Sequence, residues 1–424
     1  MENYGNLPRR DFIRTSAAVS LGALTSLKST AFAAGTDKIR VGLIGCGGRG
    51  TGAAKDCVTS SEGVEITAMG DLFSDQMDKS LARLSREIDD KVSVTKENSF
   101  SGFDAYKKVL ASDVDMVILA TPPHFRPMQL KAAIEAGKHV FMEKPVAVDP
   151  AGVRSVIESS ELAKQKGLAI VAGTQRRHQG HYIEVMKRIK EGQIGEIVSA
   201  QCFWMDEELW LKKRHPDWSD MEYQCRNWLY YTWLSGDHIV EQHLHNIDVI
   251  NWAIGSHPVS CAGIGGRQVR IAPEYGNIFD HFTVEFEYPN GVRVLSMCRQ
   301  TKGCEKRISE NIVGSNGSVF TDGKTARIKG PNAFEYQGKS PNPYVQEHAD
   351  LIASIRAGQP LNEGVQVAES TMAAIMGRMS AYTGRALSWD WVMKSSQLDL
   401  TPPSYEMGDL PVGPVAIPGK TKLV

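Results

Sequence analysis

The hydrophobic and polar positions of the chain follow one pattern up to about residue 171 and a different pattern beyond it. In the first part, short apolar runs alternate with longer segments in which apolar residues recur every three or four positions. The short runs are typical of buried strands and the longer segments of amphipathic helices. This alternation predicts βαβ units in a parallel sheet with right-handed crossovers. The expected strands and helices are, in order, residues 39–45, 51–59, 64–71, 76–88, 114–121, 127–136, 138–145, 150–166 and 168–175.

Beyond Arg177 the apolar positions follow the two-residue period of half-buried strands. The stretch HFTVEFEYPNGVRVLSM contains two such runs joined by Asn290-Gly291, a pair that favours the tight turn of a β-hairpin. A second pair of runs lies in residues 305–322 and is joined at Ser315. The helical period returns in residues 240–254, 343–357 and 364–383.

These patterns predict an α/β fold with an N-terminal Rossmann domain, a doubly wound parallel sheet over residues 37–171. We expect a second domain, residues 172–398, of the α+β class with a large, mostly antiparallel open sheet. A chain of 424 residues is long enough for two such domains. Residues 399–424 are rich in Pro and Gly without any period, so we expect an extended tail that lies over the surface or is partly disordered.

The composition excludes several classes of partner. The net charge is −1 and no block is dense in Lys and Arg, which argues against a nucleic acid and against an anionic membrane surface. After the N-terminus no apolar run approaches the roughly 20 residues of a membrane span. The seven cysteines are irregularly spaced and include no C-x-x-C pair, so the sequence indicates no zinc site and at most one or two disulfides.

Residues 1–33 have the features of an export signal. Arg9 and Arg10 are followed by Phe12 and a short, mildly apolar run, which ends in STAFAAG and fits a cleavage site after Ala33. The segment resembles the twin-arginine signal, which implies that the twin-arginine export machinery moves the chain, already folded, to the periplasm. An ordinary signal peptide and a basic arm with a short helix are the alternatives.

The turn between the first expected strand and helix places Gly45, Gly47 and Gly50 in a G-x-G-x-x-G pattern. Here the first glycine allows the tight turn, the second lets the backbone approach a pyrophosphate, and the third lets the helix pack on the strand. Asp71 ends the second strand, where a carboxylate accepts hydrogen bonds from both hydroxyls of an adenosine ribose. Because a carboxylate repels a 2′-phosphate, NAD is favoured over NADP. A glycine-rich turn without a ligand is the alternative.

Two further motifs, ATPPHFR and MEKPVA, close the strands expected at residues 114–121 and 138–145. Loops at the carboxyl ends of such strands line the ligand crevice. Together with GLIGCGGRG, GTQRRH, SGDHIVEQHLHNIDVINWAIG, IVGSNGSV and AESTMAAIMGRMSAYTGRALSWD, these motifs make the chain similar to the Gfo/Idh/MocA oxidoreductases. The resemblance covers nearly all of the chain after residue 33.

The resemblance implies that Lys144 reaches both substrate and nicotinamide, and that an acidic residue and a histidine four positions apart complete the site. The matching residues here are Glu241 and His245, which a single helix would place on one face. Oxidising a secondary alcohol releases a proton, and a lysine of lowered pKa or a histidine is suited to take it. The family has Asp where this chain has Glu241, and the extra methylene argues against an inositol or free glucose held in the usual way.

The expected site residues fall into three groups. The catalytic residues are Lys144, Glu241 and His245. The dinucleotide is expected to contact Gly45, Gly47, Gly48, Arg49, Gly50, Asp71, Thr121, Pro122, His124, Glu143 and Lys144. The substrate is expected to contact Arg176, Arg177, Trp204, Trp228, Glu241 and His245. We expect no metal. The alternatives are a purely structural His245, a surface Lys144, and a metal site formed by His238, Glu241, His245 and Asp248.

An aromatic-dense segment lies between these motifs and holds five of the eight tryptophans, Trp204, Trp210, Trp218, Trp228 and Trp233. Sugar rings stack on aromatic side chains, but aromatic residues also fill cores and subunit interfaces. Both interpretations stay open.

These observations predict a periplasmic oxidoreductase that moves hydride between a tightly bound NAD and a secondary hydroxyl of a sugar or glycoside, plausibly at C3. The periplasm has no appreciable pool of free dinucleotide, so a cofactor loaded before export has to be reset in place. An NAD-dependent glycosidase that acts by transient C3 oxidation is one alternative, and a non-catalytic sugar-binding protein is another. The open sheet and the resemblance favour a homodimer or homotetramer.

Overall fold

The first sheet is parallel and has six strands in the order β3-β2-β1-β4-β5-β6. The structure is a computed structural model that describes residues 38–424, so the export signal expected at residues 1–33 lies outside the described residues. The strands are β1 (Ile39–Ile44), β2 (Val64–Asp71), β3 (Ser99–Ser101), β4 (Met116–Leu119), β5 (His139–Met142) and β6 (Ile170–Ala172). The helices are α1 (Gly48–Ser60), α2 (Ser74–Ile88), α3 (Ala105–Ala111), α4 (Arg126–Glu135) and α5 (Pro150–Lys166).

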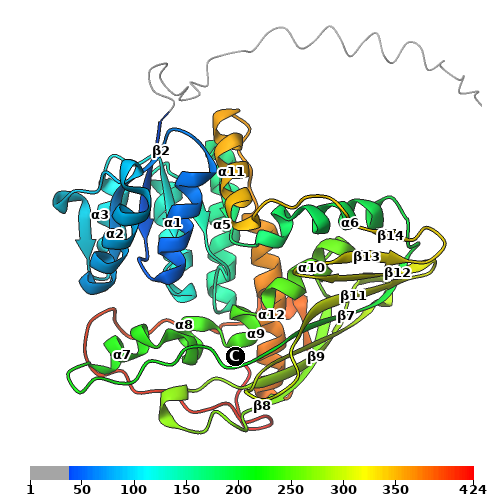
Figure 1. The fold of residues 1–424 in the computed structure, drawn as a ribbon. Coiled ribbons are helices and arrows are strands. Elements are labelled where there is room, and N and C mark those ends of the chain that lie inside the picture. The colour runs from blue at the N-terminus through cyan, green and yellow to red at the C-terminus, as the bar shows by residue number, and fades with distance from the viewer. Residues whose placement is uncertain (1–37) are drawn as a thin grey trace, which may run out of the picture. The chain divides into compact units, whose positions relative to one another are not determined.

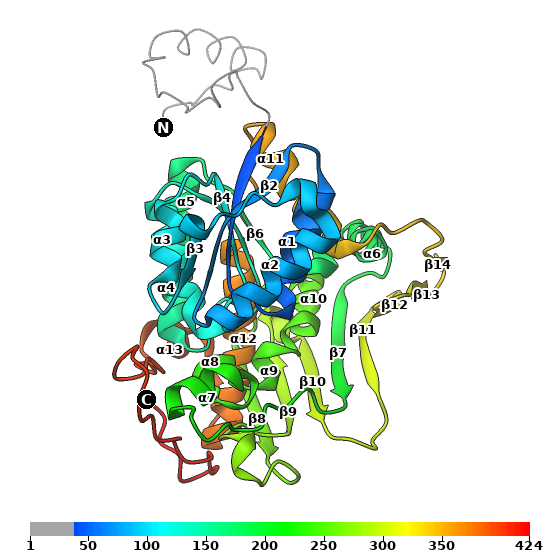
Figure 2. The same cartoon turned by 60° about the vertical axis from the view of Figure 1, so that its left-hand side comes forward.

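This arrangement confirms the doubly wound Rossmann sheet, with α1 and α2 on one face and α3, α4 and α5 on the other (Figure 2). Strand β4 is fully buried and β5 is buried except at its first residue, as their apolar runs indicate. Two elements were not predicted, β3 and α3. β3 has three residues and α3 seven, too few for either period to stand out.

The second sheet has nine strands in the order β14-β13-β12-β11-β7-β10-β9-β8-β15 (Figure 1). Every neighbouring pair is antiparallel except β7 and β10, so the expectation of a mostly antiparallel sheet is confirmed. The strands are β7 (Ile197–Asp206), β8 (Ser260–Gly266), β9 (His281–Glu287), β10 (Arg293–Gln300), β11 (Arg307–Gly314), β12 (Gly317–Asp322), β13 (Ala326–Lys329), β14 (Phe334–Glu335) and β15 (Leu387–Ser388). The predicted hairpin turn is present, with φ of 66° at Asn290 and 78° at Gly291.

Helices cover one face of this sheet (Figure 1). No helix of residues 38–424 covers the opposite face. The helices of the covered face are α6 (Gly180–Lys190), α9 (His238–Glu241), α10 (Leu244–Ile254) and α12 (Gly364–Thr383). The remaining helices are α7 (Asp220–Arg226), α8 (Thr232–Ser235), α11 (Pro343–Arg356) and α13 (Trp389–Lys394). Helix α12 packs against both α5 and β8 and so ties the two sheets together.

Helix α11 comes late in the chain but belongs to the core of the first sheet. It packs on α1, and its Leu351, Ile352 and Ile355 share a core cluster with the strands β1 and β2. Next to it, Ile170 of β6 donates its N–H to Leu361 O at 2.8 Å and accepts from Glu363 N at 2.9 Å. Helix α11 and the residues up to 363 therefore complete the helix and strand layers of the Rossmann domain.

Residues 399–424 form no helix or strand. No helix among residues 38–424 is long and apolar enough to cross a membrane. All seven cysteines lie in the described part of the chain and none is in a disulfide.

His178 links the 3₁₀ turn after β6 to α11 and to the start of α12 through two carboxylates. Its Nδ1 lies 2.6 Å from Asp350 Oδ2 and its Nε2 lies 3.2 Å from Glu363 Oε1. Burial opposes the charge, but the bonds to Asp350 and Glu363 prevail and raise the pKa of His178 to about 10. The folded protein therefore keeps a proton here that the unfolded chain releases near pH 6.5.

We expect the stability that His178 supplies to be fully present below pH 6.5 and to be lost as pH rises towards about 10. The difference in unfolding free energy between wild type and His178→Gln should shrink over this range by roughly 5 kcal/mol, at about 1.4 kcal/mol per pKa unit. Urea unfolding at a series of pH values measures this. The exposed His215, replaced in the same way, serves as the control. A difference that is constant with pH would show that His178 is neutral in the folded state.

Candidate active site

The turn between β1 and α1 has the close approaches that its glycines permit. Gly45 has a φ of +97°, and a Cβ there would lie 2.4 Å from Thr121 N. A Cβ on Gly50 would lie 1.8 Å from Gly45 O, so the third glycine is required for the packing of α1 on the turn. By contrast, a Cβ on Gly47 or Gly48 would meet nothing within 4 Å. The loop thus opens onto free space at the N-terminus of a helix, which is where a pyrophosphate binds.

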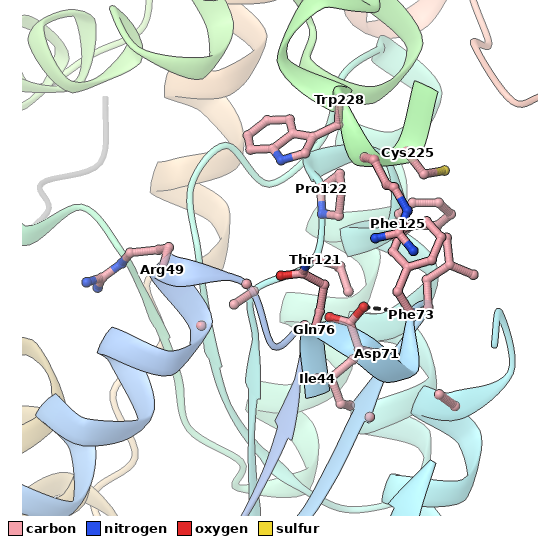
Figure 3. Close-up of a pocket in the computed structure, with 18 of the residues that line it drawn as sticks. Ile44, Arg49, Asp71, Phe73, Gln76, Thr121, Pro122, Phe125, Cys225 and Trp228 are labelled. Atoms are coloured by element: carbon pink, nitrogen blue, oxygen red, sulfur yellow. Dashed lines mark hydrogen bonds between the residues drawn. The ribbon is translucent and has the colours of Figure 1, made fainter. Parts of the chain in front are cut away.

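That space is a cavity of about 550 Å³ at the carboxyl ends of the first sheet (Figure 3). Asp71 lines it, and its carboxylate accepts N–H bonds from Cys46 at 2.6 Å and from Phe73 at 2.9 Å. Burial raises the pKa of Asp71, and these two bonds oppose the rise. The turn, the helix end and the carboxylate fit the pyrophosphate and ribose of a nicotinamide dinucleotide.

The opposite wall of the cavity comes from the second domain. Figure 3 shows Trp228 above Pro122, across the cavity from Asp71. The second-domain residues that line the cavity are Trp210, Lys212, Trp218, Cys225, Arg226 and Trp228. The sequence analysis placed Trp228 with the substrate, left Trp210 and Trp218 open between sugar stacking and packing, and gave no role to Arg226. The aromatic density pointed to the segment, but no local pattern shows which distant surface a segment covers.

Lys144 and Glu241 meet between the two domains. Lys144 follows β5, and its Nζ donates to the backbone O of Glu241 and, at 3.1 Å, to Glu241 Oε1. Both side chains are about one-tenth exposed. The pair that the resemblance brings together is therefore in contact, and the longer Glu side chain reaches the ammonium group.

The backbone before Glu241 is held in a conformation that ordinary residues rarely adopt. Asp237 has a φ of +71°, and such a residue costs about 1–3 kcal/mol unless its surroundings compensate. Its carboxylate accepts from His238 N at 2.6 Å, from Phe279 N at 2.7 Å and from Tyr382 Oη at 2.6 Å. These bonds fix the start of α9 and hence the position of Glu241 at its end.

His245 lies on a separate helix from Glu241, so the expectation of one helix over residues 240–254 is wrong. The helix breaks at Gln242 and His243, where His243 N donates to His238 O instead of continuing the four-residue pattern. His243 is buried and bonds Ser296 Oγ at 2.7 Å, and bonds of this kind hold the break in place.

The imidazole of His245 stacks on Trp204, with ring centres 5.7 Å apart and planes inclined by 23°. Burial, and then the positive charges of Lys144, Arg176 and Arg49, lower the pKa of His245 well below its usual value. Its Nδ1 has no hydrogen-bond partner among residues 38–424. His245 is therefore a neutral imidazole next to a lysine, as a proton acceptor requires.

The two arginines of the GTQRRH motif are both paired with carboxylates of the second domain. Arg176 Nη1 lies 2.6 Å from Glu310 Oε1, and its guanidinium carbon lies 5.8 Å from the centre of the Trp204 ring. It therefore borders the group around His245. Arg177 bonds Asp248 at 2.9 and 2.8 Å and packs on Trp252, neither of which lines the cavity. The structure thus places Arg177 apart from the other expected site residues.

Some of the residues expected to contact the dinucleotide line the cavity and others do not. Thr121 and Pro122 line the cavity. Arg49 lines it with its backbone side, but its guanidinium points away (Figure 3) and bonds Glu143 Oε1 at 2.5 Å. His124 does not line the cavity, because its Nε2 is bonded to Tyr405 Oη at 2.9 Å. Burial lowers the pKa of His124 to about 4. The neutral His124 side chain therefore packs between the first domain and the tail.

The structure bears on two other kinds of chemistry, a metal site and a reactive thiol. Within residues 38–424, no three His, Cys, Asp or Glu side chains are arranged to hold a metal ion. Cys46, inside the glycine turn, is buried, and burial raises the pKa of its thiol well above the usual value.

Comparison with known proteins agrees with this geometry. Residues 39–174 match the model of the GFO/IDH/MocA oxidoreductase family with an NAD-binding Rossmann fold, and residues 182–320 match the model of the GFO/IDH/MocA C-terminal domain. The chain belongs to the Gfo/Idh/MocA oxidoreductase family. Its first domain is thus an NAD(P)-binding Rossmann domain, as expected.

Relatives in this family include proteins of different activity. An inositol 2-dehydrogenase of Rhizobium meliloti is 24% identical over 67% of this chain and 76% of its own. A glycosyl hydrolase family 109 protein of Shewanella baltica is 23% identical over 53% of this chain and 50% of its own. The chain spans between 44% and 76% of the length of such curated relatives. Among solved structures, an aldose-aldose oxidoreductase from Caulobacter crescentus has the same fold, with a TM-score of 0.65 and 18% identity over 83% of this chain and 99% of the other.

Proposed function

We propose that this protein is an NAD-dependent oxidoreductase that acts on a secondary hydroxyl of a cyclic polyol, sugar or glycoside. The observation that carries the proposal is the group formed by Lys144, Glu241 and His245, which the two domains bring together beside the carboxyl end of β5. The inositol dehydrogenase relative and the aldose oxidoreductase of the same fold support this class of substrate.

The chemistry follows from the state of each side chain. The dinucleotide, when bound, accepts the hydride from the carbinol carbon or returns it. The neutral His245 takes the proton of the substrate hydroxyl, and the Lys144 ammonium donates a hydrogen bond to the same oxygen. Glu241 holds Lys144 in place through two contacts. A positioned acid or base of this kind contributes about 10²- to 10⁴-fold in rate.

NAD rather than NADP is the cofactor in this proposal. The carboxylate of Asp71 lines the cavity at the end of β2, where it binds ribose hydroxyls and repels a 2′-phosphate. The guanidinium of Arg226, which could otherwise attract a 2′-phosphate, is already paired with the carboxylates of Asp75 and Glu222.

We place the mature protein in the periplasm with its dinucleotide tightly held. This rests on Arg9, Arg10 and Phe12, which resemble a twin-arginine signal, a route that exports folded proteins. A retained dinucleotide is reset either by a second carbonyl compound or by the altered substrate itself. The uncovered face of the nine-stranded sheet is where a second copy would pack in a homodimer or homotetramer.

Protein purified from the periplasm should release close to one NAD per chain when it is denatured, as measured by mass spectrometry of the supernatant. The intact protein should then reduce its bound NAD when mixed with the right member of a panel of inositols, aldoses and methyl glycosides. Absence of any nicotinamide nucleotide would contradict the retained cofactor. Absence of reduction with every compound, despite bound NAD, would contradict the substrate class.

A glycosidase that works by transient oxidation is the second candidate, favoured by relatives that are glycosyl hydrolase family 109 proteins. Oxidation at C3 would acidify the C2 proton, the aglycone would leave by elimination, and water addition followed by reduction would restore the NAD. Nitrophenyl glycosides of several sugars and both anomers separate the two candidates. Release of nitrophenol without net change in the NAD identifies the glycosidase, and oxidised sugar without release identifies the dehydrogenase.

A further inference from the structure

Residues 207–231 of the second domain, here called the lid, form the wall of the dinucleotide cavity that faces Asp71. The lid leaves β7, contains α7, and returns to the second domain at α8. Three of its tryptophans line the cavity, Trp210, Trp218 and Trp228, and Trp210 meets Trp228 edge to face at 6.2 Å. A molecule bound on the glycine turn is thus enclosed by the lid.

Arg226, the last residue of α7, fastens the lid to the Rossmann domain. Its Nη2 lies 3.0 Å from Asp75 Oδ1 in the first turn of α2. Its guanidinium carbon lies 3.8 Å from the centre of the Phe73 ring and 4.9 Å from that of Trp218. The Arg226 side chain is 15% exposed and the Asp75 side chain 43%, so the contact is shielded on the Arg226 side only.

The contact sits at the adenosine end of the cavity. Phe73 donates its N–H to Asp71, the carboxylate placed to bind the adenosine ribose, and Phe73, Asp75 and Arg226 all line the cavity. Residues of α2 and of α7 face each other across this end of the cavity. The Arg226–Asp75 pair spans these two helices.

The tail holds the lid from outside. Gly408 O accepts from Met221 N at 3.1 Å, and Leu410 O accepts from Gln224 Nε2 at 2.6 Å, both on α7. Earlier in the tail, Tyr405 Oη bonds His124 of the Rossmann domain at 2.9 Å. Figures 1 and 2 show the red tail passing around α7. The tail therefore bridges the lid and the first domain next to the Arg226 contact.

We propose that Arg226 is a positioning residue that retains the adenosine end of the dinucleotide, and that the tail segment 399–411 locks the lid that carries it. This inference rests on the proposed function, because it assigns residues to the retained dinucleotide. It gives one chain its own means of keeping the cofactor through repeated reductions and oxidations. Release requires both the Arg226–Asp75 pair and the Tyr405 contact to open.

The test is the dissociation rate of NADH from the full-length mature protein, followed by fluorescence after excess ADP-ribose is added. Arg226→Met should release NADH about tenfold faster or more, because it loses the charge-assisted bond that joins the lid to α2. Tyr405→Ala should release it about threefold faster or more. Arg226→Lys should lie between wild type and Arg226→Met. The Kd of ADP-ribose, measured by calorimetry, should rise in Arg226→Met, since ADP-ribose contains the adenosine end and no nicotinamide.

Arg83→Met is the matched control, since Arg83 lies on α2, forms an exposed ion pair with Glu87 and does not line the cavity. If wild type retains NADH and both Arg226→Met and Tyr405→Ala release it at the rate of Arg83→Met, the retention role is overturned and the proposed function stands. If wild type binds no dinucleotide, both fail. Should Arg226→Met not fold, Asp75→Asn removes the partner carboxylate and has to show the same acceleration.

Discussion

Lys144→Met should abolish hydride transfer, with a loss in turnover of about 10³-fold or more, and should leave the dinucleotide bound. Lys144 contacts Glu241 and does not line the cavity beside the glycine turn, so in the proposed mechanism its removal takes away the hydrogen-bond donor to the substrate oxygen but no wall of that cavity. Nicotinamide absorbance after mixing with substrate measures the transfer, and mass spectrometry of the denatured protein measures the bound NAD.

Lys394→Met is the control for this prediction, because Lys394 is a solvent-exposed lysine on α13 that pairs with Asp390. It should match wild type in both measurements. Unchanged turnover in Lys144→Met would remove Lys144 from the reaction and favour a protein that binds sugar without acting on it. Loss of NAD together with turnover would place Lys144 in the cofactor site.

Glu310→Ala should lower the free energy of unfolding by about 3–5 kcal/mol, since it leaves a buried guanidinium without its partner. Glu310 is fully buried on β11 and accepts hydrogen bonds from Arg176 at 2.6 Å, from Tyr182 at 3.1 Å and from Thr321 at 2.6 Å. Urea unfolding of the cofactor-free protein gives the value, with Ala in place of the exposed Glu335 as control.

The paired replacement Arg176→Met with Glu310→Leu separates the cost of an uncompensated charge from the cost of lost packing. Removing both charges with side chains of similar size should restore most of the stability lost in Glu310→Ala. If the double variant is as unstable as the sum of the single ones, the cost comes from packing at each position rather than from the uncompensated charge.

The parts of the fold that the sequence predicted are those in which local pattern and burial coincide. Helix α5, with its Asp149 cap and Gly167 at its end, was predicted to the residue because both ends carry their own signals. The turn at Asn290-Gly291 was predicted for the same reason. The break between α9 and α10 was missed, because a continuous apolar period hides it. It depends on Ser296 of a strand some 50 positions along the chain, which bonds His243.

The residues of the candidate site also fall into a predictable group and an unpredictable one. The glycine turn and Asp71 are close in sequence and follow from the βαβ unit itself, whereas the contacts of Arg177 and His124 are decided by distant partners. His124 meets Tyr405 from 281 positions away, and Arg177 meets Asp248 from 71 positions away. From the sequence alone, a buried Arg or His that contacts a ligand cannot be distinguished from one that contacts a carboxylate of its own chain. The role of Arg226 and the lid belongs to this second group.

The place of α11 in the first core bears on the order in which the chain is made. Leu351, Ile352 and Ile355 fill the layer between α1 and the first sheet, and the backbone at residues 361 and 363 pairs with β6. During synthesis, domains generally fold in the order in which they emerge from the ribosome. Here residues 39–174 emerge first but lack one of their covering helices until almost the whole chain has been translated. The nucleotide-binding half is therefore begun first, and it gains its last covering helix only after most of the second domain has been made.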